Sequence, residues 1–304
     1  AVKTFQLRVS SSINKTTIFS KRKVPKMSFE SNPDHLNKFL RIHEVHTKIF
    51  IDKYKHWLKW CPKGEDRILD IGCRSGQLTN KFIVPILPEN FSKLHLVDKS
   101  PKMLEAAKKL FADNPKVSCE ILDFADCESG SSSLGTFDHI FSLFSLMWVA
   151  DQQKCFERIY DLLSPGGDCF LIFVAGSLYM EIIAELTGKA RWRKFIPNPD
   201  AMYPFPYRKD PDPVGSVTKM MESIGFVNIN VKLEESLFVF TTIDEFLGFF
   251  KSLPNPLDKM SPKEQEDYLK QAADLAVAHN LIGDIGERKQ NDTVSEIFVI
   301  YGRK

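Results

Sequence analysis

The residues best placed to do chemistry are acids and glycines that follow short apolar runs. Asp70, Gly72 and Gly76 lie in the stretch DIGCRSG, directly after the strand-like run RILDI. Asp98 ends the run HLVD, 22 residues beyond Gly76, and Asp123 ends the run EILD. An acid after the second strand of such a series can accept hydrogen bonds from both hydroxyls of a ribose. The order therefore predicts a site for a cofactor that contains a nucleoside.

The glycine spacing separates two kinds of cofactor loop. A dinucleotide loop, G-x-G-x-x-G, would need glycine at Arg74 and Gln77 if it began at Gly72. The spacing acid-x-Gly-x-Gly-x-Gly, used for S-adenosylmethionine, fails only at Arg74. S-adenosylmethionine has no phosphate, so its loop needs only to admit the ribose and the amino-acid end. The loop favours S-adenosylmethionine, although taken alone it also fits an arbitrary strand–turn–helix with two glycines.

The elements that must position these residues alternate between strand-like and helical patterns. The strand-like runs are RILDI, KLHLVD, SCEILD, HIFSLF and CFLIFVA. Helical patterns lie between most of them, including SPKMLEAAKKLF, with Ser100 as N-cap, and DQQKCFERIYDLL. Such alternation predicts an α/β fold with a doubly wound, parallel sheet. The late runs NINVKLEESLFVF and SEIFVIYG are expected to pair antiparallel at one edge.

Composition predicts one elaborated domain over residues 27–304, with its cofactor-binding core at 67–175. Residues 36–61 carry a helical apolar stripe that includes His43, whose default interpretation is a core histidine. An aromatic- and Pro-rich insertion at 176–212 is expected to form a lid, and 242–290 a helical cap. The 24 phenylalanines indicate either a Phe-rich core or a pocket for an apolar substrate.

The charge pattern limits partners and location. The net charge of +2 and the absence of a basic–aromatic stripe argue against a nucleic-acid partner. No apolar run reaches the ~18 residues that a membrane span needs. Residues 1–26 carry seven Lys or Arg and no acid, which indicates a disordered basic tail or a mitochondrial transit peptide. The six cysteines form no CxxC pair, so we expect reduced core cysteines in a cytoplasmic protein, with the mitochondrion as the alternative, and no metal site.

Several longer stretches carry a family resemblance. They are FDHIFSLFSLMWV, ERIYDLLSPGGDCFLIF, KDPDPVGSVTKMMESIGFVNINV and SLFVFTTIDEFL. From about Leu36 to Arg303 the chain resembles class I S-adenosylmethionine-dependent methyltransferases, and more narrowly the juvenile hormone acid O-methyltransferase family. The resemblance implies a Rossmann-like, seven-stranded sheet with a reversed last strand. It also implies methyl transfer to the carboxylate of a small apolar acid, of the sesquiterpenoid or fatty-acid type.

The resemblance assigns site residues by position. Those expected at the cofactor are Asp70, Gly72, Cys73 and Gly76 in the loop, Asp98, Lys99 and Met103 near the ribose, and Asp123 and Phe124 at the adenine. Trp148 falls on the family's carboxylate-binding tryptophan, and His43 on a glutamine that is its second carboxylate ligand. Met147 stands where the family often has histidine.

Arg74 replaces the middle glycine of the loop. If the backbone there must reach positive φ, a side chain costs roughly 1–2 kcal/mol. A micromolar cofactor binds with about 8 kcal/mol, so we expect Arg74 to weaken the site without abolishing it. Its side chain is expected to reach outward to a surface acid, or alternatively to approach a carboxylate of the cofactor or of the acceptor.

Two other functions stay open from the sequence. An RNA methyltransferase uses the same fold, and the basic tail could serve it. A non-catalytic binder with a decayed cofactor loop is compatible with Arg74, His43 and Met147.

Overall fold

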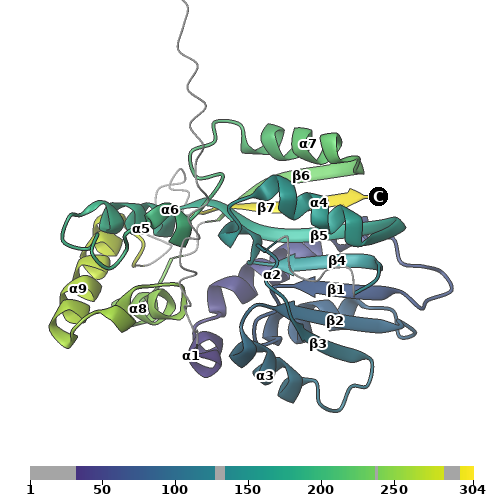
Figure 1. Cartoon of the computed structure of the whole chain (residues 1–304), viewed down its shortest axis with the longest axis horizontal. Helices are drawn as coiled ribbons and strands as arrows, with labels where there is room; N and C mark the ends of the chain where they lie inside the picture. The colour runs from purple at the N-terminus through teal and green to yellow at the C-terminus, as the bar shows by residue number, and fades with distance from the viewer. Residues whose placement is uncertain (1–31, 127–133, 237–238, 284–294) are drawn as a thin grey trace, which may run out of the picture.

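The computed structural model describes residues 32–126, 134–236, 239–283 and 295–304. The basic tail at 1–26 and Cys127 lie outside these ranges. One seven-stranded sheet runs through the molecule in the order β3-β2-β1-β4-β5-β7-β6 (Figure 1). Its strands are β1 (Arg67–Ile71), β2 (Lys93–Asp98), β3 (Val117–Ile121), β4 (Phe137–Leu143), β5 (Leu163–Ser177), β6 (Val227–Ser236) and β7 (Ser295–Arg303).

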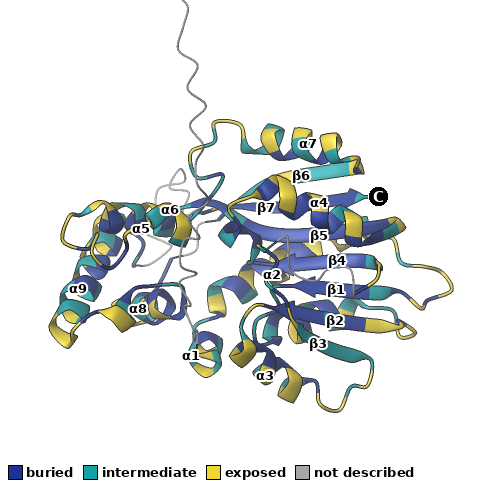
Figure 2. Ribbon diagram, in the orientation of Figure 1, coloured by how far each residue is buried: buried dark blue, intermediate teal, exposed yellow. Residues whose placement is uncertain are grey.

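The strand directions confirm the doubly wound sheet with a reversed last strand. β1 pairs in parallel with β2 and β4, β2 with β3, and β4 with β5. β7 runs antiparallel between β5 and β6. Ile68, Ile140 and Leu171 are fully buried because helices cover both faces of the sheet, as the dark blue strands of Figure 2 show. Continuous apolar runs are the pattern that such buried strands need.

Helix ends follow the capping signals of the sequence. α3 (Pro101–Leu110) begins after Ser100, whose hydroxyl accepts the backbone N–H of Met103. α7 (Pro213–Ile224) ends at Gly225, whose φ of 112° only glycine adopts readily. α9 (Pro262–Ala278) begins with a complete capping box, while α4 (Gln152–Leu162) packs beside α7. A shorter π-helical segment, η2 (Thr79–Ile83), follows the cofactor loop.

The remaining helices gather at one end of the sheet (Figure 1). They are α1 (Pro33–Lys38), α2 (Arg41–Tyr54), α5 (Leu178–Gly188), α6 (Pro199–Met202) and α8 (Ile243–Ser252), with α9 beside α5 and α8. The stripe predicted at 36–61 is thus two helices, and Leu40 lies between them. No described helix is both long and apolar enough to cross a membrane.

The expectation of core cysteines needs correction, because Cys61 is exposed. β5 begins at Leu163, six residues before the strand-like run CFLIFVA. Thr242 caps α8 by accepting the N–H of Glu245, and the Glu245 carboxylate accepts the N–H of Thr241.

A buried polar cluster lies at the amino ends of the parallel strands. His139 Nδ1 lies 2.7 Å from a carboxylate oxygen of Asp168, and its Nε2 lies 3.5 Å from Asp66. All three side chains are at most 3% exposed. The hydroxyl of Tyr301 also donates to Asp168, at 3.3 Å. This cluster joins β4, β5, β7 and the chain before β1 at the end of the strands opposite the cofactor loop.

Candidate active site

The loop after β1 turns back sharply through backbone conformations that favour glycine. Gly72 and Gly76 have φ values of 71° and 77°. A Cβ on Gly72 would lie 2.0 Å from the Ser145 hydroxyl, so only glycine fits there. Arg74, between them, has a φ of 53°. The condition under which a side chain at position 74 carries a steric cost is therefore met.

Asp70 has two buried carboxylate oxygens in different surroundings. Its Oδ2 accepts the hydroxyl of Thr79 at 2.5 Å, whereas its Oδ1 has no hydrogen-bond partner among the described residues. Burial raises the pKa of this carboxyl to about 7, with a smaller contribution from the charge of Asp98. A buried acceptor without a donor is costly. The cationic amino group of S-adenosylmethionine has the charge and the donors to satisfy it, so Asp70 fits this cofactor.

Asp98 holds the loop from the end of β2. Its two oxygens accept the backbone N–H groups of Arg74 and Ser100, both at 2.9 Å. Its side chain is 8% exposed, and burial raises its pKa while these two hydrogen bonds oppose the rise. A carboxylate oxygen can accept more than one hydrogen bond, so Asp98 retains capacity for ribose hydroxyls.

A cavity of about 270 Å³ lies against the loop. Its lining includes Asp70, Gly72, Cys73 and Arg74, and Leu40 covers it from the N-terminal helices. Met103 does not line this cavity; it packs with Leu36 and Leu40 in a separate apolar cluster. Ser75 donates to Asn37 at 2.6 Å. The N-terminal helices therefore pack directly on the cofactor loop, a contact that the sequence pattern did not predict.

The expected adenine residues lie away from that cavity. Phe124 is 6% exposed, and the guanidinium of Arg158 lies over its ring at 4.5 Å. The side chain of Phe124 therefore packs in the core. Arg158 covers one face of its ring, so only the opposite face could contact a purine. Asp123 accepts the N–H of Ala125 at 3.1 Å. Lys99 is exposed.

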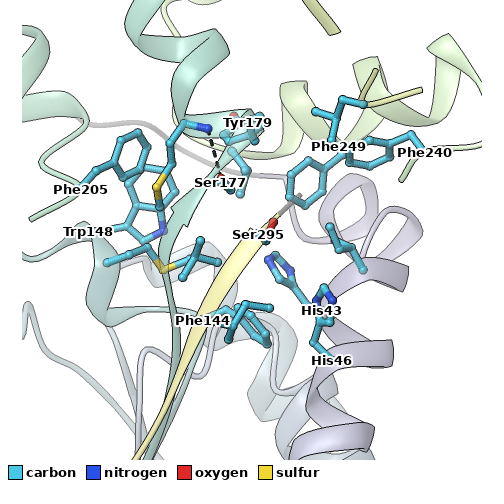
Figure 3. A pocket seen from close by; sticks show the side chains of 17 residues that line it. His43, His46, Phe144, Trp148, Ser177, Tyr179, Phe205, Phe240, Phe249 and Ser295 are labelled. Atoms are coloured by element: carbon cyan, nitrogen blue, oxygen red, sulfur yellow. Dashed lines mark hydrogen bonds between the residues drawn. The ribbon is translucent and has the colours of Figure 1, made fainter. Parts of the chain in front are cut away.

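A second, larger cavity of about 600 Å³ lies where β4, β5 and β7 meet the cap helices (Figure 3). Its walls are mainly apolar, and its lining is Ile42, His43, His46, Phe144, Met147, Trp148, Val174, Ser177, Tyr179, Met180, Phe205, Phe240, Phe249, Leu253, Leu281, Ser295 and Ile297. Phenylalanines thus serve both the core and a pocket. Its apolar lining with a few polar side chains is typical of a small-molecule site.

Trp148 and His43 are brought together in the lining of this second cavity. The Trp148 ring packs 5.3 Å from that of Phe205, and its indole N–H has no acceptor among the described residues. His43 is 4% exposed and packs 4.5 Å from Phe144 and 5.5 Å from Phe249. Burial, and then the charge of Arg74, hold the pKa of His43 well below its ordinary value. His43 is therefore neutral at pH 7.

The Arg74 side chain does not reach outward to a surface acid. Its Nη2 donates to the carbonyl of Phe144 at 2.6 Å, and its Nη1 lies 3.3 Å from His43 Nδ1. The guanidinium thus crosses from the cofactor loop to two residues of the second cavity. The outward orientation predicted from the sequence is wrong, because the loop turns the side chain toward α2 and the end of β4.

Several lining residues were missed by the sequence analysis. His46 Nε2 lies 2.5 Å from the hydroxyl of Ser236, and burial lowers the pKa of His46 to about 4. Tyr179 has a buried hydroxyl that forms no hydrogen bond with any described residue. Ser295 begins β7 and is 8% exposed. His46 follows His43 by three residues on the same helix face, and that spacing was the available signal.

Comparisons with known proteins agree with this geometry. Residues 69–169 match a family model described as a methyltransferase domain. The chain is 27% identical to the juvenile hormone acid O-methyltransferase of Bombyx mori over 84% of this chain and 90% of that protein. It is 28% identical to the Drosophila melanogaster protein of the same name, over 89% and 90%. A structure of phosphoethanolamine N-methyltransferase 2 from Haemonchus contortus, in complex with S-adenosyl-L-methionine, superposes with a TM-score of 0.51 at 17% identity. That match covers 90% of this chain and 56% of the other, and it supports the fold.

The chain therefore contains a methyltransferase domain of the class I, S-adenosylmethionine-dependent type. Within that class, it is similar over most of its length to the juvenile hormone acid O-methyltransferases.

Proposed function

We propose that this protein transfers a methyl group from S-adenosylmethionine to the carboxylate of a small apolar acid. The observation that carries the proposal is the second cavity, whose walls are apolar and which Trp148 and His43 both line. The named activity of the two insect relatives supports the same acceptor chemistry. We further propose the lid role for residues 176–212 and the cap role for 242–290, since Tyr179, Phe205 and Phe249 contribute to that lining.

The chemistry needs no general base. A carboxylic acid with a pKa near ~4–5 is already ionised at pH 7. S-adenosylmethionine supplies an electrophilic methyl group when bound. Trp148 donates its indole N–H to orient the acid, and neutral His43 donates from one ring nitrogen. The apolar walls exclude water, which strengthens both hydrogen bonds. These hydrogen bonds hold the carboxylate in line with the methyl group.

At the cofactor, we propose Asp70 for the amino group, Asp98 for the ribose and Asp123 for the adenine amino group. The Oδ1 of Asp70 is the strongest support, because it is a buried acceptor to which no group of the described ranges donates. Gly72, Cys73 and Gly76 shape the loop, while Met103 acts through the apolar cluster with Leu40.

The test is a methyl-transfer assay with labelled S-adenosylmethionine and a panel of acceptors. The panel contains dodecanoic acid, farnesoic acid, a short dicarboxylic acid, and total RNA. We expect label in the methyl esters of the two apolar acids alone. Label in RNA alone would replace this function by RNA methylation. Cofactor binding by calorimetry without transfer to any acceptor would favour a non-catalytic binder.

A further inference from the structure

Arg74 places a positive charge on the boundary between the two cavities. Arg74 lines the loop cavity, and its guanidinium contacts Phe144 and His43 of the second cavity. Arg74 and Phe144 both have positive φ, at 53° and 54°. Two adjoining backbone segments therefore adopt a conformation that non-glycine residues rarely reach, and strain of this kind collects at functional sites.

The guanidinium has no close counter-charge in the part of the chain that the structure describes. No carboxylate there forms an ion pair with it, and its two side-chain hydrogen bonds go to neutral acceptors. The charge of Asp98 acts on it, but that carboxylate accepts backbone N–H groups. A guanidinium carries five N–H donors, and its planar fork matches a carboxylate. A buried cation without an anion is costly, which is the condition that an anionic ligand relieves.

The same contact determines the tautomer of His43. Arg74 is protonated and can only donate, so Nδ1 of His43 must accept. Because His43 is neutral, its proton then lies on Nε2. A neutral histidine with the proton on Nε2 is a hydrogen-bond donor at that atom, and His43 lines the second cavity.

We propose that Arg74 binds a carboxylate at the junction of the two cavities and, through Nδ1 of His43, keeps Nε2–H as a donor toward the acceptor. The carboxylate belongs either to the amino-acid end of the cofactor or to the acceptor acid, and the second of these sources rests on the proposed function. Arg74 is thus a specificity residue that selects ligands carrying an ionised carboxyl group. It occupies the position where the cofactor-loop spacing has glycine.

The experiment compares acids with their neutral primary amides by isothermal titration calorimetry. The probes are S-adenosylhomocysteine and its carboxamide for one cavity, and dodecanoic acid and dodecanamide for the other. The proteins are the wild type, Arg74→Met, Arg74→Lys and the control Arg193→Met, in which an exposed arginine is replaced. Methionine is chosen because it keeps a long, non-glycine side chain, so the loop conformation is not relieved as it would be in Arg74→Gly.

We expect Arg74→Met to lose about tenfold or more in affinity for one of the two acids, and no more than about twofold for the matching amide. Which acid loses affinity identifies the source of the carboxylate. Arg74→Lys should keep part of the preference for the acid, and Arg193→Met all of it. Equal losses for acid and amide, or no loss for either acid, would overturn the proposal, as would a wild-type protein without any preference for acids.

Two controls keep the result interpretable. Thermal unfolding of each variant shows whether it is folded. If Arg74→Met is not folded, the acid-over-amide preference of Arg74→Lys, compared with that of the wild type, decides instead. Binding is measured without turnover, so the two proposals fail separately. A protein that methylates no apolar acid but shows the Arg74-dependent preference would overturn the proposed function alone.

Discussion

The backbone N–H of Arg74 donates to the carboxylate of Asp98 across 2.9 Å, joining the loop after β1 to the end of β2. The other oxygen of the same carboxylate accepts the backbone N–H of Ser100, the N-cap of α3. Asp98 therefore joins the cofactor loop to the start of α3, which fixes the orientation of the carboxylate that we propose for the ribose.

Asp98→Ala should weaken S-adenosylhomocysteine binding by about 1.5–3 kcal/mol, the range for hydrogen bonds to a charged group. Isothermal titration calorimetry at pH 7.5 measures it, with exposed Asp113→Ala as the matched control. An affinity within twofold of wild type would remove Asp98 from the ribose role.

Trp148→Phe keeps an aromatic ring against Phe205 and removes the indole N–H together with the five-membered ring that carries it. We expect turnover of an apolar acid to fall by about tenfold or more, because a hydrogen bond to an ionised acceptor is lost, while cofactor affinity stays the same. The control is Trp60→Phe, because Trp60 packs on His139 at the amino ends of the parallel strands. A parallel loss of cofactor affinity would indicate that Trp148 is structural.

Asp70 should make the protein without cofactor less stable as pH rises. In the unfolded chain this carboxyl ionises near its ordinary pKa of 3.8, whereas burial raises the pKa to about 7 in the folded protein. Between these values the folded state holds a proton that the unfolded state has released, so the free energy of unfolding falls with rising pH. Relative to Asp70→Asn, the wild type should lose up to about 1.4 kcal/mol per pH unit between pH 4 and 7 in urea unfolding. Identical slopes would show that Asp70 is ionised throughout.

His46 should make the protein less stable as pH falls, the opposite of the effect expected for Asp70. Its ordinary pKa is 6.5, and burial lowers it to about 4 in the folded protein. Between pH 6.5 and 4 the unfolded state holds a proton that the folded state lacks, so this contribution to stability is lost as pH falls. His46→Gln should remove that loss. Urea unfolding at pH 7 and pH 5 gives the change in the free energy of unfolding with pH, which should be smaller in the variant than in the wild type. An unchanged difference would contradict a neutral, buried His46.

Asp168→Ala should lower the free energy of unfolding by about 3–5 kcal/mol, because it leaves His139 buried without its closest partner. Cofactor affinity should not change, since this cluster lies at the amino ends of the parallel strands. Exposed Asp161→Ala is the control for stability. A loss of cofactor affinity in the folded variant would show coupling across the sheet.

The sequence predicted the framework of the site better than its interior. Strand ends and capping signals are local, so Asp70 and Asp98 could be placed before the fold was known. The direction of Arg74 depends on α2 and on the end of β4, which are distant in sequence. Phe124 was expected at the adenine, but its environment depends on Arg158, 34 residues later. Packing of this kind has no local signature, and neither does the contribution of Ser295 to the second cavity.

The N-terminal helices are part of the site, because Leu40 covers the cofactor loop and His43 contacts Arg74. The guanidinium of Arg74 is thereby shared between the wall of one cavity and the lining of the next. A ligand that shifts it from either side alters the donors offered on the other. On the roles proposed for Arg74, cofactor and acceptor are thermodynamically linked, so each changes the affinity of the other by the same factor.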